Sequence, residues 1–298
     1  MVRTKAEWIL TFREVGDSIL NDFLKDPKTQ KEKASEINKR IKEYRERETN
    51  RIEAAAKMEV WDNRTLLKEI LLLTYASYIV MLEYRNKVWK YEYMTFARRI
   101  GELWEPFCKL AFEFPVKELT MIDPPDFGAV QSKIKNDAVA YIDSLVLEEK
   151  IKTELKRYYN IPWDLVDSGG IKLALDLHFE QNGIHYNCDF KSGFSSNEKG
   201  NTNRLLLVAS IYNSLGVRER MLLFVRQPED ENNHYLQTLK NSSYWEVYCA
   251  DDSYAAMKKF TGFDMRKWID DNVNWQADIS KELRLHLERN DLLKYLTW

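Results

Sequence analysis

The stretch IKLALDLHFEQNGIHYNCDFK, residues 171–191, decides how this chain folds. Apolar and polar residues alternate along Ile171–Glu180 and Ile184–Lys191, as in half-buried β-strands, and Asn182 and Gly183 stand between these two runs. Both of these residues tolerate the positive φ that a type I′ turn of two residues requires. We therefore expect a β-hairpin whose register is fixed by its turn.

The two faces of the expected hairpin differ in polarity. Successive residues of a strand point to opposite faces, and residues that pair directly across two strands share a face. One face carries Leu173, Leu175, Leu177, Phe179, Ile184, Tyr186, Cys188 and Phe190. The other face carries Lys172, Asp176, His178, Glu180, His185, Asn187, Asp189 and Lys191. The register places Asp176 directly opposite Asp189, and a slip of one residue would drive charged side chains into the core.

Two facing carboxylates require a compensating positive charge, because like charges across a ladder repel. Lys191 lies two residues beyond Asp189 on the same face and is one candidate for this charge. A divalent cation is another, since Mg²⁺ favours carboxylate oxygens with open positions for water and a substrate phosphate. A polar outer face of the sheet with a surface salt bridge would carry the same residues.

The pattern Asp176, twelve intervening residues, then Asp189-Phe190-Lys191 resembles the signature of the PD-(D/E)xK nuclease superfamily. Leu175 stands where the family has a proline. The resemblance implies that Asp176, Asp189 and the backbone carbonyl of Phe190 bind Mg²⁺. Lys191 would orient the attacking water or help to deprotonate it. The metal would lower the pKa of that water and neutralise charge on the scissile phosphate.

The family adds an acidic residue from a helix before the hairpin, and Phe96–Phe112 is the best candidate for this helix. Its apolar residues follow helical spacing. The run GELWE at residues 101–105 resembles a helix pattern of restriction endonucleases. It points to Glu105 as a further catalytic and metal-binding residue, with Glu102 as the alternative. Pro106 predicts a kink or a restart of the helix. A surface glutamate on an amphipathic helix would fit the same pattern.

The remaining sequence fits an α/β fold, a restriction-endonuclease-like core with a mixed central sheet flanked by helices. After the polar loop 192–200 we expect a helix with Asn201 or Thr202 as its N-cap and Gly216 as its stop. Further expected elements are strands at Met221–Val225 and Trp245–Cys249, a helix or turn at Asn233–Lys240, and helices near Tyr254–Phe260, Met265–Asp271 and Ile279–Leu296.

Within this superfamily the chain looks most like a type II restriction endonuclease. That resemblance implies Mg²⁺-dependent, sequence-specific hydrolysis of double-stranded DNA by a dimer, either a homodimer or a heterodimer. Arg, Lys, Asn and Gln side chains can read base edges. The candidates for DNA contact that follow the hairpin are Ser192, Ser195, Ser196, Asn197, Lys199, Asn201, Asn203 and Arg204. Asn201 could instead only cap a helix, and Lys199 could only touch a phosphate.

We expect a helical region at 1–95, serving as a dimerisation or DNA-clamping arm, and a nuclease core with C-terminal helices at 96–298. Gln30–Met58 is rich in charge, with a narrow apolar seam that includes Ile37 and Ile41. Such a seam is typical of a long exposed helix, a coiled coil or a dimer contact. Because Glu residues are interleaved, a solvated helix or an interaction arm is favoured over a dedicated DNA reader.

Composition permits a DNA-binding protein without indicating one. The 298 residues include 45 basic and 47 acidic side chains, so phosphate binding would need a local positive cleft. Cys108, Cys188 and Cys249 lack zinc-ligand spacing and predict buried thiols in a reducing compartment, hence the cytoplasm. The sequence predicts neither a signal peptide nor a nucleotide cofactor. The thirteen apolar residues Ile70–Leu82 fall short of the ~20 that span a bilayer and predict a buried helix.

Three other interpretations stay open. The chain could be a structure-selective or phage-defence DNase with the same core. It could be a non-catalytic DNA-binding subunit of a heteromeric nuclease, although such a subunit would not need opposed carboxylates. It could also be an interaction protein built on the long charged helix, and a failure to bind Mg²⁺ would favour that interpretation.

Overall fold

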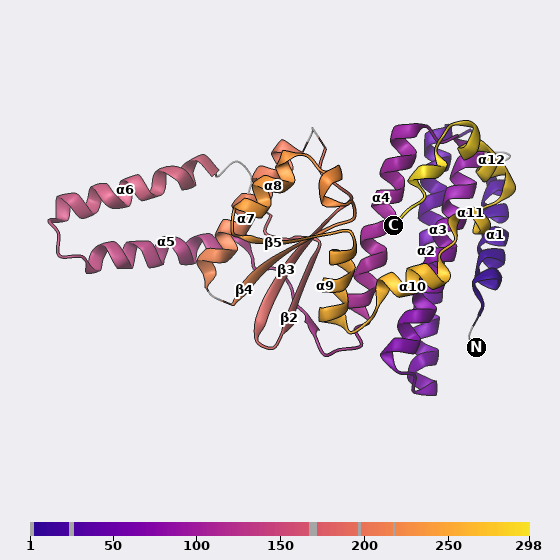
Figure 1. Ribbon diagram of the computed structural model, residues 1–298. Coiled ribbons are helices and arrows are strands. Elements are labelled where there is room, and N and C mark those ends of the chain that lie inside the picture. The colour runs from indigo at the N-terminus through magenta and orange to yellow at the C-terminus, as the bar shows by residue number, and fades with distance from the viewer. Residues whose placement is uncertain (1–2, 24–26, 167–171, 196–197, 217) are drawn as a thin grey trace. The chain divides into compact units, whose positions relative to one another are not determined.

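The computed structural model describes residues 3–23, 27–166, 172–195, 198–216 and 218–298. The chain folds into two units (Figure 1). Unit 1 comprises Met1–Glu118 and Asp251–Trp298, and unit 2 comprises Leu119–Ala250. The expected boundary between residues 95 and 96 falls inside unit 1.

Unit 1 is built from helices. Its first segment contains α1 (Lys5–Asp22), α2 (Gln30–Glu59), α3 (Asn63–Val88) and α4 (Tyr93–Glu113). Its second segment contains α9 (Asp251–Thr261), α10 (Met265–Asn272), α11 (Trp275–Asp278), α12 (Lys281–Arg289) and the 3₁₀ helix η3 (Leu293–Tyr295). Thr4 and Thr29 begin the first two helices, and each forms a capping box with the glutamate three residues later.

Helix α3 supplies the centre of unit 1. In the described part of the chain it is the one helix long and apolar enough to cross a bilayer, but most of its apolar window is buried inside the protein. This burial confirms the predicted buried helix. Helix α2 packs along α3, and its seam residues Ile37 and Ile41 are fully buried. The seam is therefore covered by the same chain.

Unit 2 contains a five-stranded sheet in the order β1-β2-β3-β4-β5. The strands are β1 (Thr120–Met121), β2 (Leu177–Gln181), β3 (Ile184–Lys191), β4 (Glu219–Val225) and β5 (Trp245–Cys249). The β1, β2 and β3 pairings are antiparallel, and β3, β4 and β5 run parallel. Crossovers through α7 (Lys199–Leu215) and α8 (His234–Asn241) join the parallel strands, with the short 3₁₀ helix η2 (Glu229–Glu231) before α8. The prediction of an α/β fold with a mixed, helix-flanked sheet is confirmed.

The hairpin has the predicted turn and register. Asn182 and Gly183 adopt φ values of 55° and 74°. Pairing runs from Gln181 opposite Ile184 to Leu177 opposite Cys188. The predicted start of the first strand was wrong, since β2 begins at Leu177, while Ile171 lies outside the described residues. Side chains, rather than ladder hydrogen bonds, hold the segment just before β2, as the site below shows.

Several helix ends differ from prediction. Helix α7 begins at Lys199 with Glu198 as its N-cap, so Asn201 and Thr202 lie inside the helix, and the predicted stop at Gly216 is confirmed. The predicted C-terminal helix Ile279–Leu296 begins later, at Lys281, because the Ser280 hydroxyl accepts a hydrogen bond from the Leu283 N–H as the N-cap of α12. It ends at Arg289, where Asp291 adopts a φ of 53°, and only the short helix η3 follows. Helix α4 continues through Pro106 as one element.

One face of the sheet packs against α7 and α8. Asn187 and Asp189 of β3 share this face with Met221, Leu223 and Val225 of β4, because they pair in register. The core beneath the two helices includes Leu205, Val208, Ala209, Tyr212, Leu236, Leu239 and Trp245. The part of the hairpin's polar face that carries His178, Asn187 and Asp189 is therefore buried, whereas Lys172 is exposed.

A helical hairpin precedes the sheet's second strand, in a region where the sequence predicts no element. It consists of α5 (Phe127–Ser144) and α6 (Glu149–Val166), which lie side by side and extend away from the sheet (Figure 1). We call this hairpin the arm.

Candidate functional site

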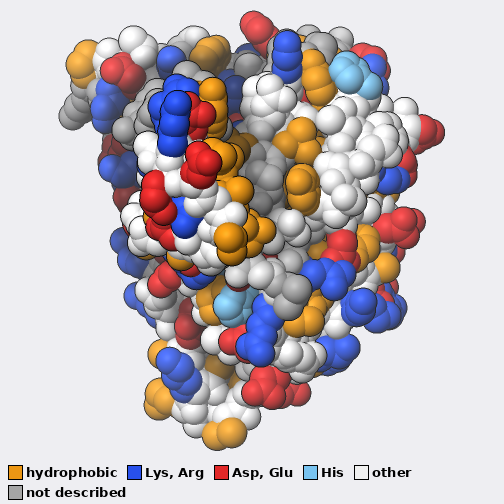
Figure 2. All heavy atoms as spheres, turned by 90° about the vertical axis from the view of Figure 1, so that its left-hand side faces the viewer, with side chains coloured by type: hydrophobic (Ala, Val, Ile, Leu, Met, Phe, Trp, Pro, Cys, Tyr) orange, Lys and Arg blue, Asp and Glu red, His pale blue; other side chains and the backbone are white. Residues whose placement is uncertain are grey.

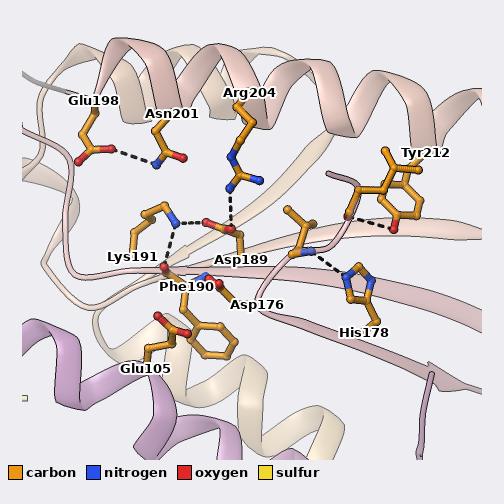
Figure 3. A network of polar contacts seen from close by, with 12 residues as sticks. Glu105, Asp176, His178, Asp189, Phe190, Lys191, Glu198, Asn201, Arg204 and Tyr212 are labelled. Atoms are coloured by element: carbon orange, nitrogen blue, oxygen red, sulfur yellow. Dashed lines mark hydrogen bonds and ion pairs between the residues drawn. The ribbon is translucent and has the colours of Figure 1, made fainter. Parts of the chain in front are cut away.

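Asp189 lies on β3, on the sheet face that α7 covers. Only 1% of the residue is exposed. Its carboxylate forms a salt bridge with Lys191, and Arg204 approaches Oδ1 from α7 at 3.4 Å (Figure 3). A surface salt bridge on an outer sheet face is therefore ruled out as the explanation of this carboxylate. Burying an ionised group is costly unless it is paired, and here two cations are supplied.

Asp176 lies at the bend just before β2. Its Oδ2 accepts a hydrogen bond of 2.8 Å from the backbone N–H of Phe190. The Asp176 side chain therefore bonds the Phe190 N–H that a strand partner would otherwise accept. Backbone pairing between β2 and β3 begins only at Leu177, opposite Cys188. The two carboxylates lie on adjacent segments but are not a ladder pair.

Lys191 provides the predicted positive charge. Its ammonium contacts the Asp189 carboxylate and donates to the backbone carbonyl of Phe190 at 3.1 Å. These are two of the three groups that the resemblance assigns to a metal ion. The Lys191 ammonium therefore occupies the position beside these oxygens where the resemblance would place a metal ion.

Burial raises the pKa of Asp189 from 3.8 to about 6. The positive charge of Lys191 acts in the opposite direction, the negative charge of Asp176 adds to the rise, and Arg204 opposes it. Asp189 is thus a carboxyl group whose ionisation depends strongly on nearby cations. Such perturbed groups concentrate at functional sites, although structural ion pairs produce them as well.

The contact of Arg204 with Asp189 was not predicted from the sequence, where Arg204 is a candidate for DNA contact. A signal was available, since Arg204 precedes Val208 by four residues and Tyr212 by eight. Residues at this spacing share one helix face, and Val208 and Tyr212 form part of the core against the sheet. An arginine on that face is directed to the sheet.

A chain of hydrogen bonds crosses the same sheet face and ends beside Asp176. The Leu175 N–H donates to Nε2 of His178 at 2.9 Å, so Nδ1 carries the proton and donates to Oδ1 of Asn187 at 2.7 Å. The Asn187 amide in turn donates to Glu219 at 2.7 Å. Burial lowers the pKa of His178, which keeps this tautomer neutral. His178 therefore fixes the backbone that carries Asp176.

The predicted DNA-contact residues have different surroundings. Ser195, Lys199 and Asn203 are exposed, whereas Ser196 and Asn197 lie outside the described residues. The hydroxyl of Ser192 accepts hydrogen bonds from Arg226 at 3.0 and 2.9 Å. Asn201 donates to Glu198 at 3.0 Å, within the first turn of α7. Ser192 and Asn201 thus already have partners within the chain.

Both candidate helix acids lie on α4 in unit 1, whereas the other predicted catalytic residues lie in unit 2. Glu105 pairs with Lys109 at 3.3 Å. Glu102 pairs with Arg98 at 2.7 Å and with Arg99 at 3.4 Å.

The oxygen donors beside Lys191 fit Mg²⁺ in their chemistry. Across the described ranges, no group of three or more His, Cys, Asp or Glu side chains is arranged to hold a metal ion. Mg²⁺ does not require such a cage, because it commonly binds one or two carboxylates and keeps several waters. Asp189 and the Phe190 carbonyl, which both contact the Lys191 ammonium, and the nearby Asp176 are the oxygen donors that could form such a smaller set.

Comparison of the chain with protein-family models, with curated proteins and with solved structures found no match.

Proposed function

We propose that this protein is a Mg²⁺-dependent endonuclease of double-stranded DNA, of the type II restriction kind. The observation that carries the proposal is the buried Asp189 carboxylate, bonded to Lys191 and neighboured by Asp176. A buried carboxylate with a raised pKa is poorly suited to a purely structural role, because an apolar replacement of similar size is often at least as stable. The order hairpin, α7, β4 agrees with the nuclease core that the motif resembles.

Asp176, Asp189 and the Phe190 carbonyl would hold the metal. Bound Mg²⁺ supplies a water of lowered pKa and offsets charge on the phosphate. Lys191 would leave the Asp189 carboxylate and direct its ammonium to the attacking water or to the phosphate oxygens. Arg204 would keep one oxygen of Asp189 oriented from α7.

The proposal is tested by incubating plasmid DNA with wild type and with Lys191→Ala, in Mg²⁺ and in EDTA. Discrete fragments are expected from wild type in Mg²⁺ only. Lys191→Ala should cut at least about a hundredfold more slowly, because it lacks a charge that stabilises the transition state. Lys267→Ala is a matched control, since Lys267 is an exposed lysine of α10 in an ion pair with Asp271, and it should cut like wild type.

The pattern of products distinguishes the proposal from its alternatives. Single-strand nicks would indicate a missing partner subunit, and cleavage without discrete fragments would indicate a structure-selective or defence nuclease. If neither protein cuts any of a panel of DNAs and calorimetry detects no Mg²⁺ binding, the nuclease proposal is wrong.

A further inference from the structure

The arm exposes an apolar stripe. On α6, Ile151, Leu155 and Tyr158 follow the spacing i, i+4, i+7 and are 43%, 38% and 57% exposed. This spacing places the three side chains on one face of the helix, as in a coiled-coil seam. Figure 2 looks onto the end of the arm and shows hydrophobic side chains gathered there between acidic and basic ones.

The contact between α5 and α6 uses the polar side of α6 instead. Lys156 forms an ion pair with Asp143 at 2.6 Å, and Lys152 donates to the Asp143 carbonyl at 3.1 Å. Tyr159 donates to the carbonyl of Ile134 at 3.3 Å. An amphipathic helix normally buries its apolar stripe. Here the polar side faces the neighbouring helix, and the apolar stripe is turned outward.

The charges beside the stripe favour a second copy of this chain as its partner. Lys150, Glu154 and Arg157 are exposed and spaced i, i+4, i+7 along one flank. In an antiparallel pair of α6 helices, a two-fold axis midway between residues 155 and 156 brings Glu154 beside Arg157 of the partner subunit. The same axis forms this ion pair twice and packs the two stripes together. Because residues 148–161 include four basic and three acidic side chains, they offer little attraction to a polyanion such as DNA.

We infer that the protein forms a homodimer through the arm, with the α6 stripes of two copies packed antiparallel. The inference does not depend on the proposed nuclease activity. It places dimerisation in the arm, whereas the sequence predicted a dimerisation or DNA-clamping role for residues 1–95, where the seam residues Ile37 and Ile41 of α2 are buried within the same chain.

Sedimentation velocity at micromolar concentration tests the inference. Wild type should sediment as a dimer. Leu155→Glu should weaken association at least about tenfold, because each dimer then buries the new charge twice. Leu285→Glu is a matched control, since Leu285 of α12 is exposed to nearly the same extent, 39% against 38% for Leu155. It should remain a dimer. A monomeric wild type, or a Leu155→Glu protein that associates as tightly as wild type, would overturn the inference.

A charge exchange tests the register and does not depend on the leucine variant being folded. Glu154→Arg alone and Arg157→Glu alone should each weaken the dimer, because each leaves like charges facing across the interface. The double variant Glu154→Arg/Arg157→Glu should restore association, since both ion pairs re-form with reversed polarity. If the double variant is weaker than both single variants, the antiparallel register is wrong.

Discussion

The carboxyl group of Asp189 is buried, since only 1% of the residue is exposed to solvent. In the folded chain its pKa is raised to about 6 by burial, against 3.8 in the absence of the fold. The folded state therefore binds this proton more tightly than the unfolded state does. A group of this kind stabilises the fold below its unfolded pKa and loses that contribution as the pH rises through the folded value.

We accordingly expect the stability of the wild type, relative to Asp189→Asn, to fall between about pH 4 and pH 6 in EDTA. The asparagine does not titrate, so the difference between the two proteins isolates this carboxyl group. Urea denaturation at a series of pH values measures it. A difference that stays constant across this range would show that Asp189 has an ordinary pKa in the fold.

At the scale of elements, α1 and α3 meet at a glycine. A Cβ on Gly16 would lie 2.6 Å from the ring of Tyr84, closer than real Cβ contacts allow. The ring is held in place, because its hydroxyl donates to the Asp17 carboxylate at 2.6 Å and also lies 2.9 Å from the Arg13 carbonyl oxygen. Two effects on stability therefore oppose each other in Gly16→Ala. Alanine has the higher helix propensity, but its Cβ would clash with the Tyr84 ring.

Gly16→Ala should destabilise the protein, since overpacking costs about 1–3 kcal/mol and alanine gains only up to ~1 kcal/mol over glycine in a helix. Gly200→Ala on α7 is the control, because its Cβ would meet nothing within 4 Å, and it should be neutral or stabilising. Thermal unfolding of both variants gives the comparison. If Gly16→Ala is as stable as Gly200→Ala, then α1 and α3 can move apart to accept the methyl group at no measurable cost in stability.

The hairpin can be predicted from the sequence because one dipeptide determines it. Asn182-Gly183 sets the register, and alternation then decides which side chains share a face. The beginning of β2 could not be predicted in this way, because it depends on side chains. His178 and Asp176 each bind a backbone N–H that a longer ladder would have used.

The candidate site was only partly predictable. Asp189 and Lys191 share a strand and a face by spacing alone, and the structure brings them into contact. That their face is covered depends on the packing of α7, which no local pattern specifies. The arm was missed although its signal was available, since Ile151, Leu155 and Tyr158 stand at helical spacing in the sequence. That this stripe faces outward depends on how α5 and α6 pack, which the local pattern does not specify.

At the scale of the whole molecule, unit 1 is assembled from two distant parts of the chain. Trp104 of α4 donates to the Tyr254 hydroxyl at 2.8 Å, and Tyr75 of α3 donates to Asp278 at 2.9 Å. The Ser280 N–H donates to buried Glu83 at 2.6 Å. The second segment therefore completes both the core and the polar network of the first.

A chain that ends at Ala250 should consequently lack a folded unit 1. Hydrogen exchange of the α3 amides measures this, with strong protection in the full chain and rapid exchange in the shortened one. Asp278→Asn in the full chain is the control, because it weakens one link and leaves the second segment in place. Protected α3 amides in the shortened chain would show that the first segment folds alone.

The division of unit 1 has a consequence for how the protein is made. A ribosome must finish the whole of unit 2 before it reaches Asp251. At typical rates of 5–20 residues per second, this delay lasts on the order of 10 s. Throughout that time α1, α2 and α4 can already pack on α3, whereas the part of its surface that faces the second segment stays open. Unit 1 therefore reaches its final packing only after unit 2 has been made, and until then the nascent chain keeps some apolar surface open to a chaperone.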